Sequence, residues 1–205
     1  MKYDWKKSEK EFYMPKTTPE LRDIPPMIFF TLSGVGDPNA PDFASKVAAL
    51  YSLSYAVKMS PKKNLAPANF SDFVVYPLEG IWRLNDKTRA YSATDKTNFA
   101  YKIMIRQPDF VDESFFIKIR EITRQKKPNL PIAQIKFEKI ADGKSLQILH
   151  VGTYDDEPTS FAKLAKFCLA NNLQRRDDTH REIYLSDARK TAPEKLKTVL
   201  RWSVK

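Results

Sequence analysis

The chain has 205 residues, a hydrophobic content of 42% and a formal net charge of +10. These values allow a real hydrophobic core in one large domain or two small ones, and they exclude a disordered protein. No apolar run approaches the roughly 20 residues that cross a bilayer, and the charged N-terminus shows no secretory signal. We therefore expect a cytoplasmic protein that has no membrane partner.

The positive charge does not by itself indicate nucleic acid as a partner. Lysine and arginine are spread over the whole chain, and no recognition motif accompanies them, so we expect no specific nucleic-acid binding. The single cysteine, Cys168, cannot form an internal disulfide. The two histidines, His150 and His180, have no further ligands at a metal-site spacing, so we expect neither a metal nor another cofactor.

The sequence of the first half of the chain predicts a polar arm, three strands and two helices. Residues 1–26 read as an N-terminal arm held by its aromatic side chains. Residues 27–32 predict a buried strand, and residues 42–59 predict a helix that ends before Pro61. Two strands follow at residues 72–84 and 98–106, separated by the polar residues 85–97. Residues 109–126 fit a helix or a strand, and the acids at their start favour a helix.

The second half of the chain repeats this order of elements. Asp142 and Gly143 predict a hairpin turn between strands 132–140 and 145–151. A helix at residues 160–171, a strand at 180–185 and a final strand at 198–204 follow. Strand, helix, strand, strand therefore occurs twice, at about residues 27–106 and 145–204, with a connecting helix and strand at about 109–141. We expect one α+β domain over residues 27–205, with a mainly antiparallel sheet, helices on one face and a ligand cleft on the other.

The strand at residues 180–185 is the best candidate for a functional element. Ile183 and Leu185 alternate with Glu182 and Tyr184, so a carboxylate and a phenol share one face. If this face looks onto water, the strand is an ordinary surface strand. If it lines a cleft, a poorly hydrated carboxylate among aromatic rings suits a cationic or polarised aromatic ligand.

Four segments together resemble the stand-alone GyrI-like small-molecule-binding proteins. They are residues 34–39 (Gly-Val-Gly-Asp-Pro-Asn), 76–82 (Tyr-Pro-Leu-Glu-Gly-Ile-Trp), 150–158 (His-Val-Gly-Thr-Tyr-Asp-Asp-Glu-Pro) and 180–187 (His-Arg-Glu-Ile-Tyr-Leu-Ser-Asp). The resemblance implies a tandem pair of strand-helix-strand-strand modules with a cleft between them. It also implies that Glu182 looks into this cleft among aromatic side chains. Related domains sense drugs when they are joined to DNA-binding segments, which this chain lacks.

The candidate ligand contacts are carboxylates and aromatic rings. Glu182 is the first carboxylate and Glu79 the second, although a paired surface glutamate and a turn residue explain them equally well. The candidate aromatic contacts are Trp82, Tyr154, Tyr184 and Tyr55, each of which a core or packing role also explains.

Three classes of function stay open. The first is a small-molecule-binding protein that takes up aromatic compounds, including cationic ones, as a monomer or weak homodimer. The second, implied by the resemblance, is a hydrolase of strained, cyclopropane-type electrophiles. In that case Glu182 would be the general base on water, and Tyr154 or Tyr184 the proton donor. The third is an interaction protein with a macromolecular partner.

Overall fold

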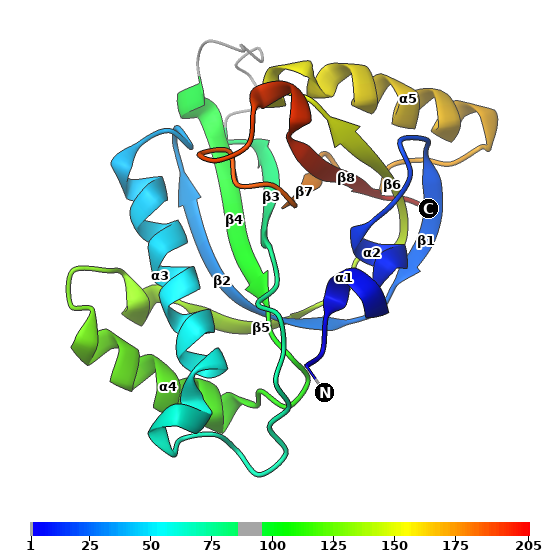
Figure 1. The fold of residues 1–205 in the computed structure, drawn as a ribbon. Coiled ribbons are helices and arrows are strands. Elements are labelled where there is room, and N and C mark those ends of the chain that lie inside the picture. Colours follow the sequence, from blue (N-terminus) through cyan, green and yellow to red (C-terminus); the bar gives the residue numbers. More distant parts are fainter. Residues whose placement is uncertain (1, 86–95) are drawn as a thin grey trace.

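The computed structural model describes residues 2–85 and 96–205 of the chain. One eight-stranded antiparallel sheet curls into a half-barrel, and the helices pack against it (Figure 1). The strands are β1 (Glu20–Ile24), β2 (Met27–Val35), β3 (Leu78–Leu84), β4 (Phe99–Arg106), β5 (Lys136–Ile140), β6 (Gly143–Val151), β7 (His180–Tyr184) and β8 (Lys197–Ser203). The helices are α1 (Trp5–Ser8), α2 (Lys10–Tyr13), α3 (Pro41–Lys58), α4 (Glu113–Lys126) and α5 (Glu157–Ala170). The expected α+β class is confirmed.

The strand order, β1-β6-β8-β7-β3-β4-β2-β5, is symmetric about the β7–β3 pair. The unit β2-α3-β3-β4 on one side has its counterpart in β6-α5-β7-β8 on the other. The antiparallel pairing of β3 with β7 joins the two units, with Trp82 opposite His180 and Gly80 opposite Glu182. The repeated order of elements in the sequence therefore corresponds to two halves of one sheet.

The ambiguous segment after Pro108 is helical, as expected. Helix α4 begins after Asp112, whose side chain accepts a hydrogen bond from the backbone N–H of Phe115 at 2.7 Å. This cap satisfies a backbone donor that the first helical turn would leave unpaired. The polar connector expected at residues 85–97 lies largely outside the described residues.

The hairpin expected at Asp142 and Gly143 is wrong. Strand β5 pairs with β2 and strand β6 pairs with β1 and β8, so the chain passes here from one half of the sheet to the other. The physical reason lies in the side chain of Asp142. It accepts hydrogen bonds from Arg181 of β7 at 2.7 Å and from Arg201 of β8 at 3.2 Å. These contacts hold the turn against β7 and β8, so β5 and β6 do not pair with each other.

The N-terminal segment is more structured than an arm. Residues 20–24 form β1, which pairs with β6 at one edge of the sheet. Residues before it cover one face of the sheet, where Arg201 donates to the carbonyl of Phe12 at 2.7 Å and Gln147 donates to that of Glu11 at 2.7 Å. Trp5 and Tyr13 are buried there.

The two faces of the sheet carry different covers. Residues paired across antiparallel strands point to the same side, so Trp82, Gly80, Glu182 and His180 share one face. Helix α3 packs on this face, with Phe43 against Trp82 at 5.8 Å between ring centroids, and α5 brings Phe161 to within 5.0 Å of His180. Glu182 therefore lies on the face of the sheet that carries α3 and α5. The sequence analysis placed Glu182 on the face without helices, and in the structure the N-terminal residues cover that face.

None of the helices in residues 2–85 and 96–205 combines the length and the apolar character that a membrane-spanning segment needs.

We predict that Asp142→Ala lowers the free energy of unfolding by about 3–5 kcal/mol, because it leaves two buried guanidinium groups without their shared carboxylate. Urea unfolding followed by circular dichroism measures this change. Asp187→Ala is the control, since Asp187 pairs with Arg189 at the surface and its loss should change stability little. Equal effects of the two substitutions would contradict the assigned role of Asp142.

Candidate functional site

The candidate site is built around the Glu182 carboxylate on β7. The Glu182 side chain is 12% exposed, and Tyr184 Oη donates to its Oε2 at 2.8 Å. Trp82 Nε1 in turn donates to Tyr184 Oη at 2.9 Å. This chain of hydrogen bonds orients Tyr184 so that its hydroxyl hydrogen points at the carboxylate.

Gly80 makes this arrangement possible. The Trp82 ring lies across the backbone of Gly80, where an added Cβ would stand 2.5 Å from Trp82 Nε1. Any side chain at this position would displace the indole from Tyr184. The glycine between Glu79 and Ile81 is therefore a packing requirement of the site.

The second oxygen of Glu182 contacts a histidine. His180 Nε2 lies 2.8 Å from Glu182 Oε1, and the Phe161 ring packs edge-on against the imidazole. Within the described part of the chain, no lysine or arginine forms an ion pair with Glu182. The carboxylate is thus largely removed from water, and its neighbours are a phenol, an imidazole and aromatic rings.

Two tyrosines face each other beside the carboxylate. The rings of Tyr154 and Tyr184 meet edge to face at a centroid distance of 6.0 Å. Burial raises the pKa of Tyr184 well above its ordinary value, and the charge of Glu182 adds to this effect. Burial, and then Glu182, also raise the pKa of Tyr154. Both phenols therefore keep their protons at neutral pH and can act as donors.

A second carboxyl group, which the sequence analysis missed, lies next to this cluster. Glu157 at the start of α5 is 6% exposed, and its Oε1 has no hydrogen-bond partner among the described residues. Burial raises the pKa of Glu157 to about 10, and the charges of Glu182 and Asp155 act in the same direction. The first helical turn would favour the charged form, but desolvation outweighs that effect here.

The structure brings together Glu182, Tyr184, Tyr154 and Trp82, and it places Glu79 and Tyr55 elsewhere. Glu79 lies on the opposite face of the sheet, where it is fully buried and pairs with Arg181 at 2.8 Å. Burial raises the pKa of Glu79, and Arg181 opposes the shift. Glu79, the second candidate carboxylate, therefore does not share a site with Glu182, because the pairing of β3 with β7 places the two on opposite faces.

Tyr55 is also separate from the Glu182 cluster. It is 53% exposed and lines a groove between α3 and α4. The spacing of Tyr51 and Tyr55 along α3 gives them a common face, and their rings lie 6.4 Å apart. Trp82 is only 5% exposed, so it serves as a wall behind Tyr184 and not as an open contact surface.

No metal centre is evident in the described ranges. Across residues 2–85 and 96–205, no group of three or more His, Cys, Asp or Glu side chains could hold a metal ion. His150 is buried, and its Nδ1 lies 2.9 Å from the Ser160 hydroxyl of α5. This contact between His150 of β6 and Ser160 holds the first turns of α5 against the sheet.

The family model for the GyrI-like small molecule binding domain matches residues 17–205, which is nearly the whole chain. This chain belongs to the GyrI-like family. Small-molecule binding, the main function expected from the sequence, agrees with this membership. The matched range begins before β1, so the family domain includes the edge strand that the sequence analysis assigned to the arm.

Two similar crystal structures come from Listeria innocua. One, described as a hydrolase, is 37% identical to this GyrI-like chain, with a TM-score of 0.93 and coverage of 100% of both chains. The other, described as an uncharacterized conserved protein, is also 37% identical, with a TM-score of 0.91 and the same coverage. A comparison with curated proteins returns no match.

A more distant likeness concerns the fold alone. The C-terminal domain of EcmrR is 16% identical, with a TM-score of 0.52, and the alignment covers 92% of this chain and 97% of that domain. The curled sheet with two related halves is therefore shared beyond recognisable sequence similarity.

We predict that Glu157→Gln stabilises the protein at alkaline pH. In the folded state Glu157 holds its proton up to about pH 10, whereas an unfolded carboxyl loses it near its ordinary value of 4.5. The unfolding free energy of the native chain should therefore fall as the pH rises between these values. Urea unfolding at about pH 8 should show the variant more stable by on the order of 5 kcal/mol, because each pH unit above 4.5 lowers the stability of the native chain by about 1.4 kcal/mol. An unchanged pH dependence in the variant would contradict the assigned protonation of Glu157.

Proposed function

We propose that this GyrI-like protein binds aromatic, cationic compounds against the Glu182 carboxylate. The observation that carries the proposal is a carboxylate with 12% exposure that lies among aromatic rings, without a lysine or arginine partner in the described ranges. Desolvating a carboxylate is costly unless a partner compensates it. A ligand cation would add its positive charge to the phenol and imidazole contacts that the chain supplies.

The neighbouring groups add to this preference for a cation. Tyr154 and Tyr184 present aromatic rings beside Glu182, and an aromatic face attracts a cation by about 0.5–2 kcal/mol. Glu157 provides a second carboxyl group that a bound cation would favour in its charged form. A positively charged ligand thus gains from two carboxyl groups and from the tyrosine rings at one place, whereas a neutral ligand of the same shape gains from ring contacts alone.

A matched pair of ligands tests this proposal. N-methylphenanthridinium is a planar cation, and phenanthridine is its neutral counterpart at neutral pH. Isothermal titration calorimetry should show that Glu182→Gln weakens binding of the cation by roughly tenfold or more, since a charge-assisted contact is lost. Binding of phenanthridine should change little.

Glu121→Gln provides the matched control for this experiment. Glu121 lies on the exposed face of α4 and pairs with Arg124 at 2.7 Å, so its substitution removes the same charge far from the ring cluster. This variant should bind both ligands as the native protein does. A loss of cation affinity equal to that of Glu182→Gln would show that overall charge, and not the Glu182 site, attracts the ligand.

We propose hydrolysis of strained electrophiles as the alternative function, because two carboxyl groups at the site have different environments. The raised pKa of Glu157 makes it an acid at neutral pH, next to the Glu182 carboxylate, and such a pair suits acid–base chemistry. The Listeria innocua relative described as a hydrolase supports this reading.

The proposed reaction adds one water molecule to a spirocyclopropyl dienone. Glu182 accepts a proton from water while the water oxygen bonds to a cyclopropane carbon. The ring C–C bond breaks, and its electron pair moves into the dienone oxygen, which becomes a phenol by taking a proton from Tyr154 or Glu157. Proton exchange with solvent then restores both groups.

Turnover separates the two functions. The native protein, incubated with excess spirocyclopropyl dienone, should form more than one equivalent of ring-opened alcohol, measured by liquid chromatography. Glu182→Gln should lose at least about a hundredfold in rate, the contribution expected of a general base. Binding without product beyond the uncatalysed rate would leave the protein as a binder alone.

We also propose a cytoplasmic monomer or weak homodimer without a specific nucleic-acid partner. The dispersed positive charge supports the absence of a specific nucleic-acid partner, since no recognition motif accompanies it. Sedimentation velocity gives the oligomeric state. Retention of duplex DNA at physiological salt, measured by filter binding, would contradict the absence of a nucleic-acid partner.

A further inference from the structure

A groove between α3 and α4 lies apart from the Glu182 cluster. Its volume is about 410 Å³, which is within the range of about 300–1,000 Å³ typical of small-molecule sites. Tyr51 and Tyr55 line it from α3, and Ile119 and Ile122 line it from α4. In Figure 1 these helices lie together at the lower left, away from the start of α5.

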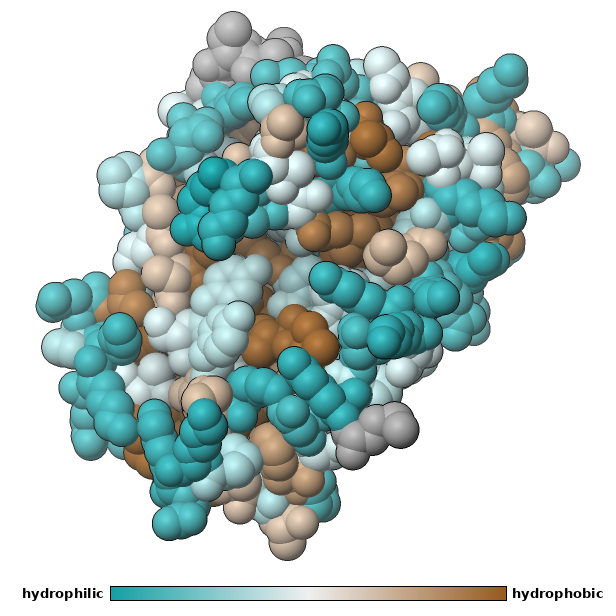
Figure 2. Space-filling model, viewed as in Figure 1, coloured by the Kyte–Doolittle hydropathy of each residue, from teal (hydrophilic) through white to brown (hydrophobic). Residues whose placement is uncertain are grey.

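The inside of the groove is apolar. Ile119 is buried at its base, whereas Met59, Leu65 and Ile122 are partly exposed along its walls. The exposed ring of Tyr55 lies beside Tyr51, which gives the groove an aromatic edge. Brown, apolar side chains are visible among teal ones over this part of the molecule (Figure 2). An apolar ligand body would cover this surface and remove it from water.

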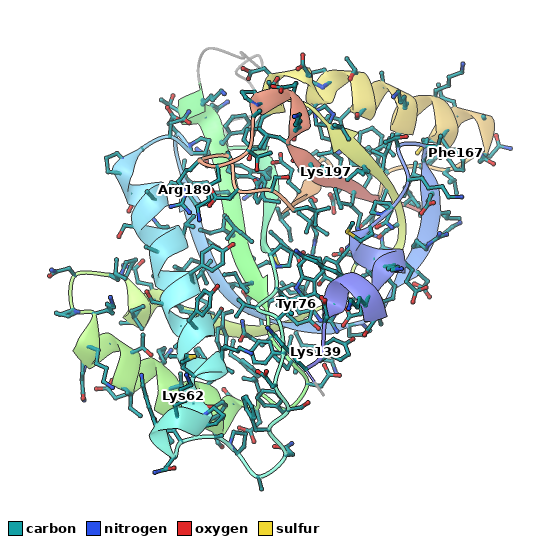
Figure 3. All side chains as sticks on the ribbon, in the orientation of Figure 1. Lys62, Tyr76, Lys139, Phe167, Arg189 and Lys197 are labelled. Carbon is teal, nitrogen blue, oxygen red and sulfur yellow. The ribbon has the colours of Figure 1, made fainter. Side chains whose placement is uncertain are left out.

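Three lysines, Lys63, Lys126 and Lys127, border the same groove. All three are exposed, and none of them forms an ion pair within the described part of the chain. The left-handed conformation of Asn64 ends the turn that carries Lys63, while Lys126 ends α4. Figure 3 shows the neighbouring Lys62 at the C-terminal end of α3, so positive charge gathers at this end of the groove.

We propose that the α3–α4 groove binds an amphipathic carboxylate, with its apolar chain along Ile119, Ile122 and Tyr55 and its carboxylate among the three lysines. A neutral ligand would leave the lysines without a counter-charge, and a cation would be repelled by them. The ligand charge preferred here is thus opposite to that proposed for Glu182. Tyr55, which was expected beside Glu182, belongs to this second site.

Decanoate and decyltrimethylammonium test the proposal, because they share an apolar chain and differ in the sign of the head group. Isothermal titration calorimetry should show saturable, one-to-one binding of decanoate to the native chain and to Glu182→Gln. Decyltrimethylammonium should not bind Glu182→Gln at the same concentrations, because this variant removes the proposed cation contact on β7. Lys63→Glu combined with Lys127→Glu should weaken decanoate binding by roughly tenfold. Ala56→Phe, which fills the groove from α3, should weaken it without any change in charge.

The control is Lys139→Glu combined with Lys166→Glu, two exposed lysines on β5 and α5 that change the net charge by the same amount. This control and Glu182→Gln should both bind decanoate as the native protein does, which makes the result independent of the Glu182 site. Equal weakening in the control and in the Lys63/Lys127 variant, unchanged binding in Ala56→Phe, or preference of Glu182→Gln for the cation would each overturn the proposal.

Discussion

The alternation of side chains along β7 is the constraint on which the two faces of this protein depend. Arg181 points to one face, where it donates to Glu79 at 2.8 Å and to Asp142 at 2.7 Å. Glu182, the next residue, points to the other face, where α3 and α5 pack. A shift of one residue in the register would exchange the two, which would place Glu182 beside the Glu79 and Asp142 carboxylates and take Arg181 away from them. The Arg181 ion pairs therefore hold Glu182 in position.

The two faces of the sheet differ in whether their buried carboxyl groups are paired with arginine. On the face that the N-terminal residues cover, every carboxylate of the Arg181 network meets a guanidinium group, and Arg201 binds both Asp142 and the amide oxygen of Gln147. On the helix-bearing face, Glu182 has only neutral or titratable donors, and Glu157 keeps its proton. The first arrangement satisfies itself and stabilises the fold. The second arrangement leaves the negative charge of Glu182 without a guanidinium or ammonium partner, so a cationic ligand would be attracted to it.

Much of the fold followed from local patterns, and most of the site did not. Apolar periodicity predicted α3 and β7, because the burial of one face dictates apolar spacing along each element. The acids at the start of residues 109–126 favoured the helix α4. The hairpin at Asp142 failed because a tertiary contact, the pair of arginines, overrode the local turn preference. The role of Glu79 could not be inferred, since the face on which it lies relative to Glu182 depends on the register between β3 and β7. Glu157 escaped notice because the predicted helix began at residue 160, which left Glu157 in the preceding turn, whereas α5 begins at Glu157.

The most direct test is a crystal structure of the protein with bound N-methylphenanthridinium. The account predicts that the ring system lies against Tyr154 and Tyr184, with its charged ring within contact distance of the Glu182 carboxylate. Density for the ligand in the α3–α4 groove, or anywhere that leaves Glu182 with its present neighbours only, would contradict the assignment of Glu182 as the centre of cation binding.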